Sequence, residues 1–138
     1  MNEDQVKEKY MQFKMIQEHI EQMSEHLQAL NQQNEDIEIS INALHEMTTT
    51  ELNTDLLTPI ADGIFISSKL TNNKTVIVNV GSNVTVEKTI PEAIKLLQKQ
   101  QKETVTKVQE VEELVEQFNQ QAMRIYNDVE KAQQKSEE

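Results

Sequence analysis

The chain has 138 residues, which suits one domain, and it contains no cysteine and no tryptophan. The missing cysteine excludes disulfides, thiolate nucleophiles and cysteine-ligated zinc. With 4% aromatic residues and two glycines, the composition suits long helices better than a compact globule. The formal net charge is −11 and no segment is basic overall, which argues against binding to nucleic acid or to an anionic membrane.

The N-terminal residues, Met1-Asn2-Glu3-Asp4, are polar and acidic, unlike a secretory signal peptide. No apolar run approaches the roughly 20 residues that a bilayer-spanning helix needs. We therefore expect a soluble, cytoplasmic protein without a membrane partner.

Residues 1–50 predict one long helix, because neither proline nor glycine interrupts them. The run Thr48-Thr49-Thr50, with its low helix propensity, is the expected end. Ten of twelve heptad core positions are apolar over about six heptads, which is typical of a coiled coil. The a positions are Val6, Phe13, Ile20, Leu27, Asn34 and Ile41, and the d positions are Lys9, Ile16, Met23, Leu30, Ile37 and Leu44.

Residues 51–90 change to a strand-like pattern with four short β-rich runs. The runs cover residues 55–60, 64–70, 75–80 and 84–88, and turn-forming residues separate them, so two β-hairpins are expected. Pro59 makes the first run an edge strand. Hairpins this small leave unpaired edges and an uncovered apolar face at Val76, Val78, Val80, Val84 and Val86. We therefore expect an oligomerisation module that closes a shared sheet or β-barrel with other chains.

Residues 91–138 predict a second long helix, which runs to about Gln134. Thr89 and Glu92 form a capping box, and Pro91 lies in the first turn, where its missing N–H is harmless. Ten of its twelve core positions are again apolar, the exceptions being Gln101 and Thr104. The a positions are Ile94, Gln101, Val108, Val115, Ala122 and Val129, and the d positions are Leu97, Thr104, Val111, Phe118, Ile125 and Ala132.

Two helices of nearly equal length, about 40 residues apart, favour an antiparallel coiled-coil hairpin within the chain. Parallel homodimers of each helix are the alternative. The polar core residues Asn34, Gln101 and Thr104 are expected to fix the register of the coiled coil at some cost in stability.

Apolar side chains outside the heptad stripe gather near both chain ends. They are Tyr10, Met11 and Met15 beside Val6 and Phe13, and Met123 and Tyr126 beside Ile125 and Val129. In an antiparallel pair these clusters would meet at the free ends and form an adaptable binding surface. Fraying or self-association of a loose end explains the same residues equally well.

Residues that would indicate catalysis or metal binding are missing. His19 and His26 lie seven residues apart on one flank and are best explained as solvent-exposed, because metal ligands on a helix need closer spacing. No glycine-rich phosphate loop or nucleophile elbow is present. We expect no enzyme activity, no cofactor and no metal.

The order helix, two hairpins, helix resembles the prefoldin α subunit of archaea. The segments that carry the resemblance are Leu57-Thr58-Pro59-Ile60-Ala61-Asp62-Gly63-Ile64-Phe65 and Val76-Ile77-Val78-Asn79-Val80-Gly81-Ser82-Asn83-Val84-Thr85-Val86-Glu87-Lys88-Thr89. Ala61-Asp62 stands where many relatives have a more glycine-rich turn. The resemblance covers nearly the whole chain and implies one mostly α domain, a long antiparallel coiled coil with two β-hairpins at the hinge.

The resemblance also implies a function. It implies a hexamer of two α and four prefoldin β subunits, an ATP-independent holdase that binds unfolded client proteins and delivers them to a group II chaperonin. The implied client-binding residues are Val6, Tyr10, Met11, Phe13, Ile125, Tyr126 and Val129. The implied oligomerisation residues are Ile64, Ile66, Val76, Val78, Val80, Val84 and Val86. A structural spacer or adaptor without client binding is the alternative, and a substrate-binding arm of an enzyme would need a catalytic domain that these residues do not contain.

Overall fold

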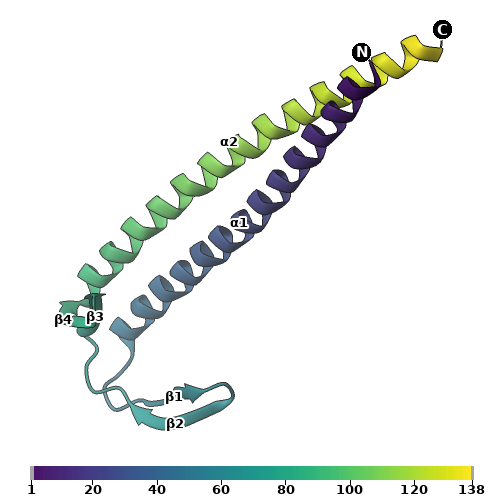
Figure 1. The fold of residues 1–138 in the computed structure, drawn as a ribbon. Helices are drawn as coiled ribbons and strands as arrows, with labels where there is room; N and C mark the ends of the chain where they lie inside the picture. The colour runs from purple at the N-terminus through teal and green to yellow at the C-terminus, as the bar shows by residue number, and fades with distance from the viewer. Residues whose placement is uncertain (1, 138) are drawn as a thin grey trace. The chain divides into compact units, whose positions relative to one another are not determined.

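The structure is a computed structural model that describes residues 2–137. In chain order the elements are α1 (Glu3–Thr49), β1 (Asp55–Ala61), β2 (Ile64–Lys69), β3 (Thr75–Gly81), β4 (Val84–Thr89) and α2 (Ile90–Glu137) (Figure 1). This confirms the predicted order of a helix, two hairpins and a second helix. The helices contain 47 and 48 residues, so each is roughly 70 Å long at the usual rise per residue.

Side chains satisfy the free backbone groups at both ends of α1. At the start, Gln5 N donates to Asn2 Oδ1 at 2.9 Å and Asn2 N donates to Gln5 Oε1 at 3.1 Å, a reciprocal cap. At the end, the hydroxyls of Thr48, Thr49 and Thr50 donate to carbonyl oxygens of the last turn at 2.6–3.1 Å. The threonine run therefore ends the helix, as the sequence predicts.

The predicted cap of α2 is present. Glu92 N donates to Thr89 Oγ1 at 3.3 Å, and that hydroxyl lies 3.0 Å from Glu92 Oε1. Ile90 N donates to the carbonyl of Lys74 at 3.0 Å. Because Thr89 is both the last residue of β4 and the cap of α2, the strand continues directly into the helix.

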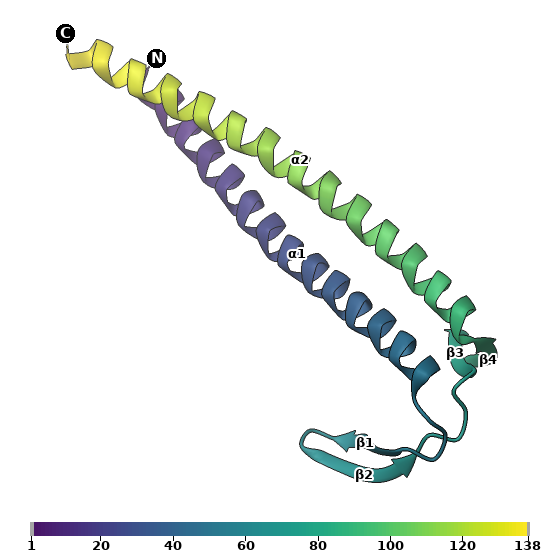
Figure 2. The ribbon, with the colours of Figure 1, turned by 180° about the vertical axis from the view of Figure 1, so that it is seen from behind.

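The chain divides into two compact units, and each contains part of both helices. In the unit formed by residues 1–33 and 104–138, the start of α1 lies beside the end of α2 (Figures 1 and 2). In the unit formed by residues 34–103, the end of α1 packs against the start of α2 through a buried cluster of Ile37, Ile41, Ile90 and Ile94. Both units therefore pair the helices antiparallel, as predicted.

The heptad stripes explain the burial along both helices. Every predicted a and d position, from Val6 to Leu44 and from Ile94 to Ala132, is buried or half-buried. The polar core residues behave differently from one another. Thr104 is buried, and Gln101 Nε2 donates to Glu38 Oε2 at 2.7 Å, whereas the buried Asn34 Oδ1 accepts no hydrogen bond among the described residues.

The strands form two separate two-stranded antiparallel sheets, β1–β2 and β3–β4. In each sheet the register shifts by one residue just before the turn, between Pro59 and Ala61 and between Asn79 and Gly81. The second turn has positive φ at both central residues, 50° at Ser82 and 62° at Asn83. This geometry suits a two-residue hairpin turn, because it matches the twist of the strands.

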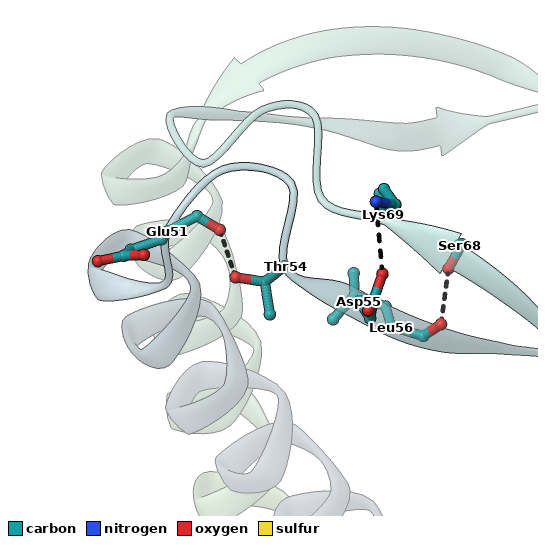
Figure 3. A network of polar contacts seen from close by, with 6 residues as sticks. All are labelled: Glu51, Thr54, Asp55, Leu56, Ser68 and Lys69. Carbon is teal, nitrogen blue, oxygen red and sulfur yellow. Dashed lines mark hydrogen bonds and ion pairs between the residues drawn. The ribbon is translucent and has the colours of Figure 1, made fainter.

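Backbone hydrogen bonds between the loop that follows α1 and Leu70 close the base of the first hairpin. Asn53 N donates to the carbonyl of Leu70 at 2.7 Å, and Leu70 N donates to the carbonyl of Thr54 at 3.0 Å. In Figure 3, Thr54 Oγ1 donates to the carbonyl of Glu51 at 2.6 Å, and Lys69 Nζ lies 3.7 Å from Asp55 Oδ1. These contacts hold the base of the hairpin, while the rest of β1 and β2 extends beyond them.

Candidate functional site

Among the described residues, neither a metal site nor a membrane-spanning helix is found. Within residues 2–137 no three His, Asp or Glu side chains are grouped so that they could hold a metal ion. Over the same residues, neither helix is long and apolar enough to cross a bilayer. His19 stacks on Phe118 with ring centroids 5.7 Å apart, so this histidine is held by an aromatic neighbour. The candidate functional sites are surfaces where large apolar side chains stay exposed.

One apolar surface lies at the free ends of the helices, in the unit of residues 1–33 and 104–138. We call the exposed side chains Tyr10, Met11, Met15, Met123 and Tyr126 the tip surface; each is between 58% and 66% exposed. The rings of Phe13 and Tyr126 lie 6.5 Å apart between centroids, so residues from both chain ends meet here.

The sequence-predicted client-binding residues fall into two groups at this tip. Tyr10, Met11 and Tyr126 are exposed and belong to the tip surface. Val6, Phe13, Ile125 and Val129 are half-buried because they are also core positions of the coiled coil. The second group supports the surface from beneath and offers less area to a ligand. Met15 and Met123 are as exposed as the first group and complete it.

A groove of about 490 Å³ lies between the helices in the same unit, and we call it the tip groove. The half-buried Ile16 and Ile125 line it together with Met15. Charged residues also line it: Lys9 from α1, and Arg124 and Asp128 from α2. Sequence reasoning missed this groove, since its width depends on how the two helices pack. The one sequence signal was Lys9, a charged residue at a d position.

The second apolar surface is on the hairpins, in the unit of residues 34–103. In the first hairpin Pro59 is opposite Phe65, and Thr58 is opposite Ile66. Phe65 and Ile66 are neighbours in β2, so their side chains point to opposite faces of the sheet, and both are exposed. The hairpin therefore has uncovered apolar side chains on both faces.

The sequence-predicted oligomerisation residues differ in how far the chain itself covers them. Ile64, Ile66, Val80 and Val84 are exposed, while Val78 and Val86, which are opposite each other, are half-buried. The expectation that Val76 lacks a cover is wrong, because it packs against the buried isoleucine cluster of its own chain. Four further apolar residues of the hairpins are exposed and were not among the predicted ones, although each lies in or beside a run of apolar residues in the sequence: Leu57, Ile60, Phe65 and Ile77.

These features define a class of protein: an antiparallel coiled-coil subunit with two small apolar hairpins between its helices. Residues 16–135 match the family model described as Prefoldin subunit. The match spans most of the chain, and the chain belongs to the prefoldin family.

Relatives and solved structures agree with this assignment. The chain is 25% identical over 134 residues to the protein named Prefoldin subunit alpha of Archaeoglobus fulgidus, covering 97% of this chain and 98% of that one. It is 28% identical over 94 residues to the protein of the same name from Methanococcus aeolicus, covering 68% of this chain and 62% of the relative. The resemblance to archaeal α subunits is thus confirmed.

The fold agrees as well. A cryo-EM structure of filamentous PFD from Methanocaldococcus jannaschii matches with a TM-score of 0.73 and 18% identity, covering 88% of this chain and 98% of the other. At 18% sequence identity, this likeness shows that the two chains share a fold.

Proposed function

We propose that this prefoldin-family subunit is an ATP-independent holdase that binds unfolded proteins through its tip surface and delivers them to a group II chaperonin. The observation that carries the proposal is the tip surface itself, five exposed apolar side chains contributed by both helices. Two of them are tyrosines and three are methionines, and flexible methionine side chains adapt to differing partners.

The energy of the contact supports binding by several side chains together. Fully burying one large apolar side chain contributes about 1.5–3 kcal/mol. A micromolar complex needs about 8 kcal/mol after the costs of association are included. One side chain is therefore too little, whereas the tip surface as a whole supplies enough for weak, reversible holding.

Assembly through the hairpins is part of the same proposal. Isolated two-stranded hairpins are marginal in water, and their strand edges are open to pairing. We propose that the hairpins join those of other subunits in a β-barrel, at the centre of a hexamer of two α and four prefoldin β subunits. The exposed Ile64, Ile66, Val80 and Val84 would be covered there. A cytoplasmic location and the absence of an enzymatic step belong to this proposal.

Suppression of aggregation tests the holdase function. The full chain, mixed with a prefoldin β subunit, should suppress light scattering by a diluted denatured client without nucleotide. The triple variant Tyr10→Ser, Met11→Ser, Tyr126→Ser should lose at least about half of this suppression, since it removes three exposed anchors of the tip surface. The native mass should stay unchanged.

A matched control removes the same number of exposed apolar side chains elsewhere on the helices. The variant Ile39→Ser, Val105→Ser, Leu114→Ser should hold clients as well as the parent chain. Equal activity of the tip variant and the parent would contradict the proposal and favour a structural spacer or adaptor. Delivery is tested by adding a group II chaperonin with ATP and measuring recovery of native client.

The likeness to filamentous PFD favours a second candidate, assembly of copies of this chain into filaments. Native mass distinguishes the two. A homodimer that becomes a hexamer with β subunits supports the first proposal, and a ladder of masses that lengthens with concentration of the chain alone supports the second.

A further inference from the structure

The tip groove combines apolar side chains with positive charge, although the chain as a whole is strongly acidic. Lys9 and Arg124 line it beside Met15, Ile16 and Ile125. Asp128 is the one acidic residue of the lining, so with neutral histidine the lining has a net charge of +1, whereas the chain carries −11. The groove therefore differs in sign from the protein around it.

The two cations are available to a ligand. The structure shows no ion pair of Lys9 or Arg124 with any residue whose side chain it describes, even though Asp128 lines the same groove. Lys9 is half-buried at a core position of α1. A lysine there places its hydrocarbon stem along the apolar seam while its ammonium group stays in water.

We propose that the tip groove selects apolar segments of non-native polypeptides that carry an acidic side chain beside the apolar one. This inference rests on the proposed function and names a substrate class for the tip groove, which shares Met15 with the tip surface. The apolar residue would fill the space over Ile16 and Ile125, and its neighbouring carboxylate would pair with Lys9 and Arg124.

The net charge of the chain opposes acidic ligands at long range, but salt weakens that effect. At physiological ionic strength charges more than about 8 Å apart are largely screened. A carboxylate in contact with Lys9 or Arg124 is screened less, because the paired charges lie well within that distance of each other. Local pairing therefore decides selectivity once the apolar residue has docked.

Three labelled peptides test the proposal. They share one apolar core sequence and differ only in the residues that flank it, which are glutamate, serine or lysine. Their affinity for the full chain is measured by fluorescence anisotropy at 150 mM and 500 mM NaCl. Two exposed ion pairs change affinity by up to about fivefold each. We expect the acidic peptide to bind about three- to tenfold more tightly than the lysine peptide at 150 mM, and less selectively at 500 mM.

Variants locate the effect. Lys9→Gln with Arg124→Gln should reduce the affinity for the acidic peptide to that for the serine peptide. The control variant, Lys107→Gln with Lys131→Gln, changes the net charge equally at exposed positions of the same unit and should keep the selectivity. Circular dichroism checks that all variants remain helical.

The outcomes separate this inference from the proposed function. If all three peptides bind equally, or the lysine peptide binds best, while aggregation is still suppressed, the selectivity is wrong and the holdase remains. Equal loss of selectivity in the control variant would also overturn it, because net charge and not the groove would be responsible. If aggregation is not suppressed and no peptide binds, the proposed function itself fails.

Discussion

At the residue scale, Asn34 departs from the apolar pattern of the seam and has no compensating hydrogen bond at its oxygen. Its Oδ1 is buried and accepts no hydrogen bond among the described residues. A buried, unsatisfied polar group costs about 1–3 kcal/mol. A polar residue at one a position also disfavours other registers and partners, which is the physical reason for a coiled coil to tolerate it.

The substitution Asn34→Leu should therefore raise the free energy of unfolding by about 1–3 kcal/mol, because it replaces the unsatisfied amide with apolar volume. Urea unfolding followed by circular dichroism at 222 nm measures the change. Asn31→Leu, at an exposed position of the same helix, serves as the control and should stay within about 0.5 kcal/mol. A destabilised Asn34→Leu protein would show that the amide makes a contact that this structure lacks.

At the element scale, the heptad pattern determines which face of each helix is buried, and α1 contains a direct comparison. Ile41 is 6% exposed within the buried isoleucine cluster, while Ile39, two residues earlier, is 59% exposed. The two side chains are chemically identical. Their contributions to stability should differ only because the helix places one in the seam and the other outside it.

Ile41→Ala should lower the free energy of unfolding by about 2–5 kcal/mol, since it removes buried apolar contacts and leaves a cavity. Ile39→Ala should change it by less than about 0.5 kcal/mol. Chemical denaturation of both variants under identical conditions measures the difference. Similar losses for the two variants would show that the exposed face of α1 is covered in solution.

At the scale of the whole molecule, the two apolar surfaces belong to different compact units. The tip surface lies in the unit of residues 1–33 and 104–138, and the hairpins lie in the unit of residues 34–103. Each unit has its own buried residues, including Ala122 in the first and Ile90 in the second. Substitutions in one should leave the other intact, because sites that share no contacts contribute independently.

The double variant Ile64→Lys, Ile66→Lys should therefore fail to assemble while it remains helical. Two charges on the hairpin would have to be buried without partners in a shared sheet. Native mass spectrometry, with and without a β subunit, gives the readout. Ser67→Lys with Thr85→Lys adds the same charge at exposed polar strand positions and should assemble normally. If the isoleucine variant reaches the full mass, the hairpins are not the assembly surface.

Sequence by itself determined the elements and their buried faces. The heptad repeats, the threonine run that ends α1 and the cap at Thr89 are local signals, and each depends on residues a few positions apart. The turn at Ser82-Asn83 was predictable for the same reason. The predicted client-binding and oligomerisation roles remain predictions, since they concern partners that one chain does not contain.

Only the tertiary structure decided which apolar side chains stay exposed once the helices pair. It showed that Val76 packs on its own chain, that Leu57 and Ile77 are uncovered, and that Lys9 and Arg124 line one groove. The residues in each of these contacts come from segments far apart in the sequence. Their proximity depends on how the helices and hairpins pack within each unit. The heptad and strand periodicities do not determine which residues from different segments come together.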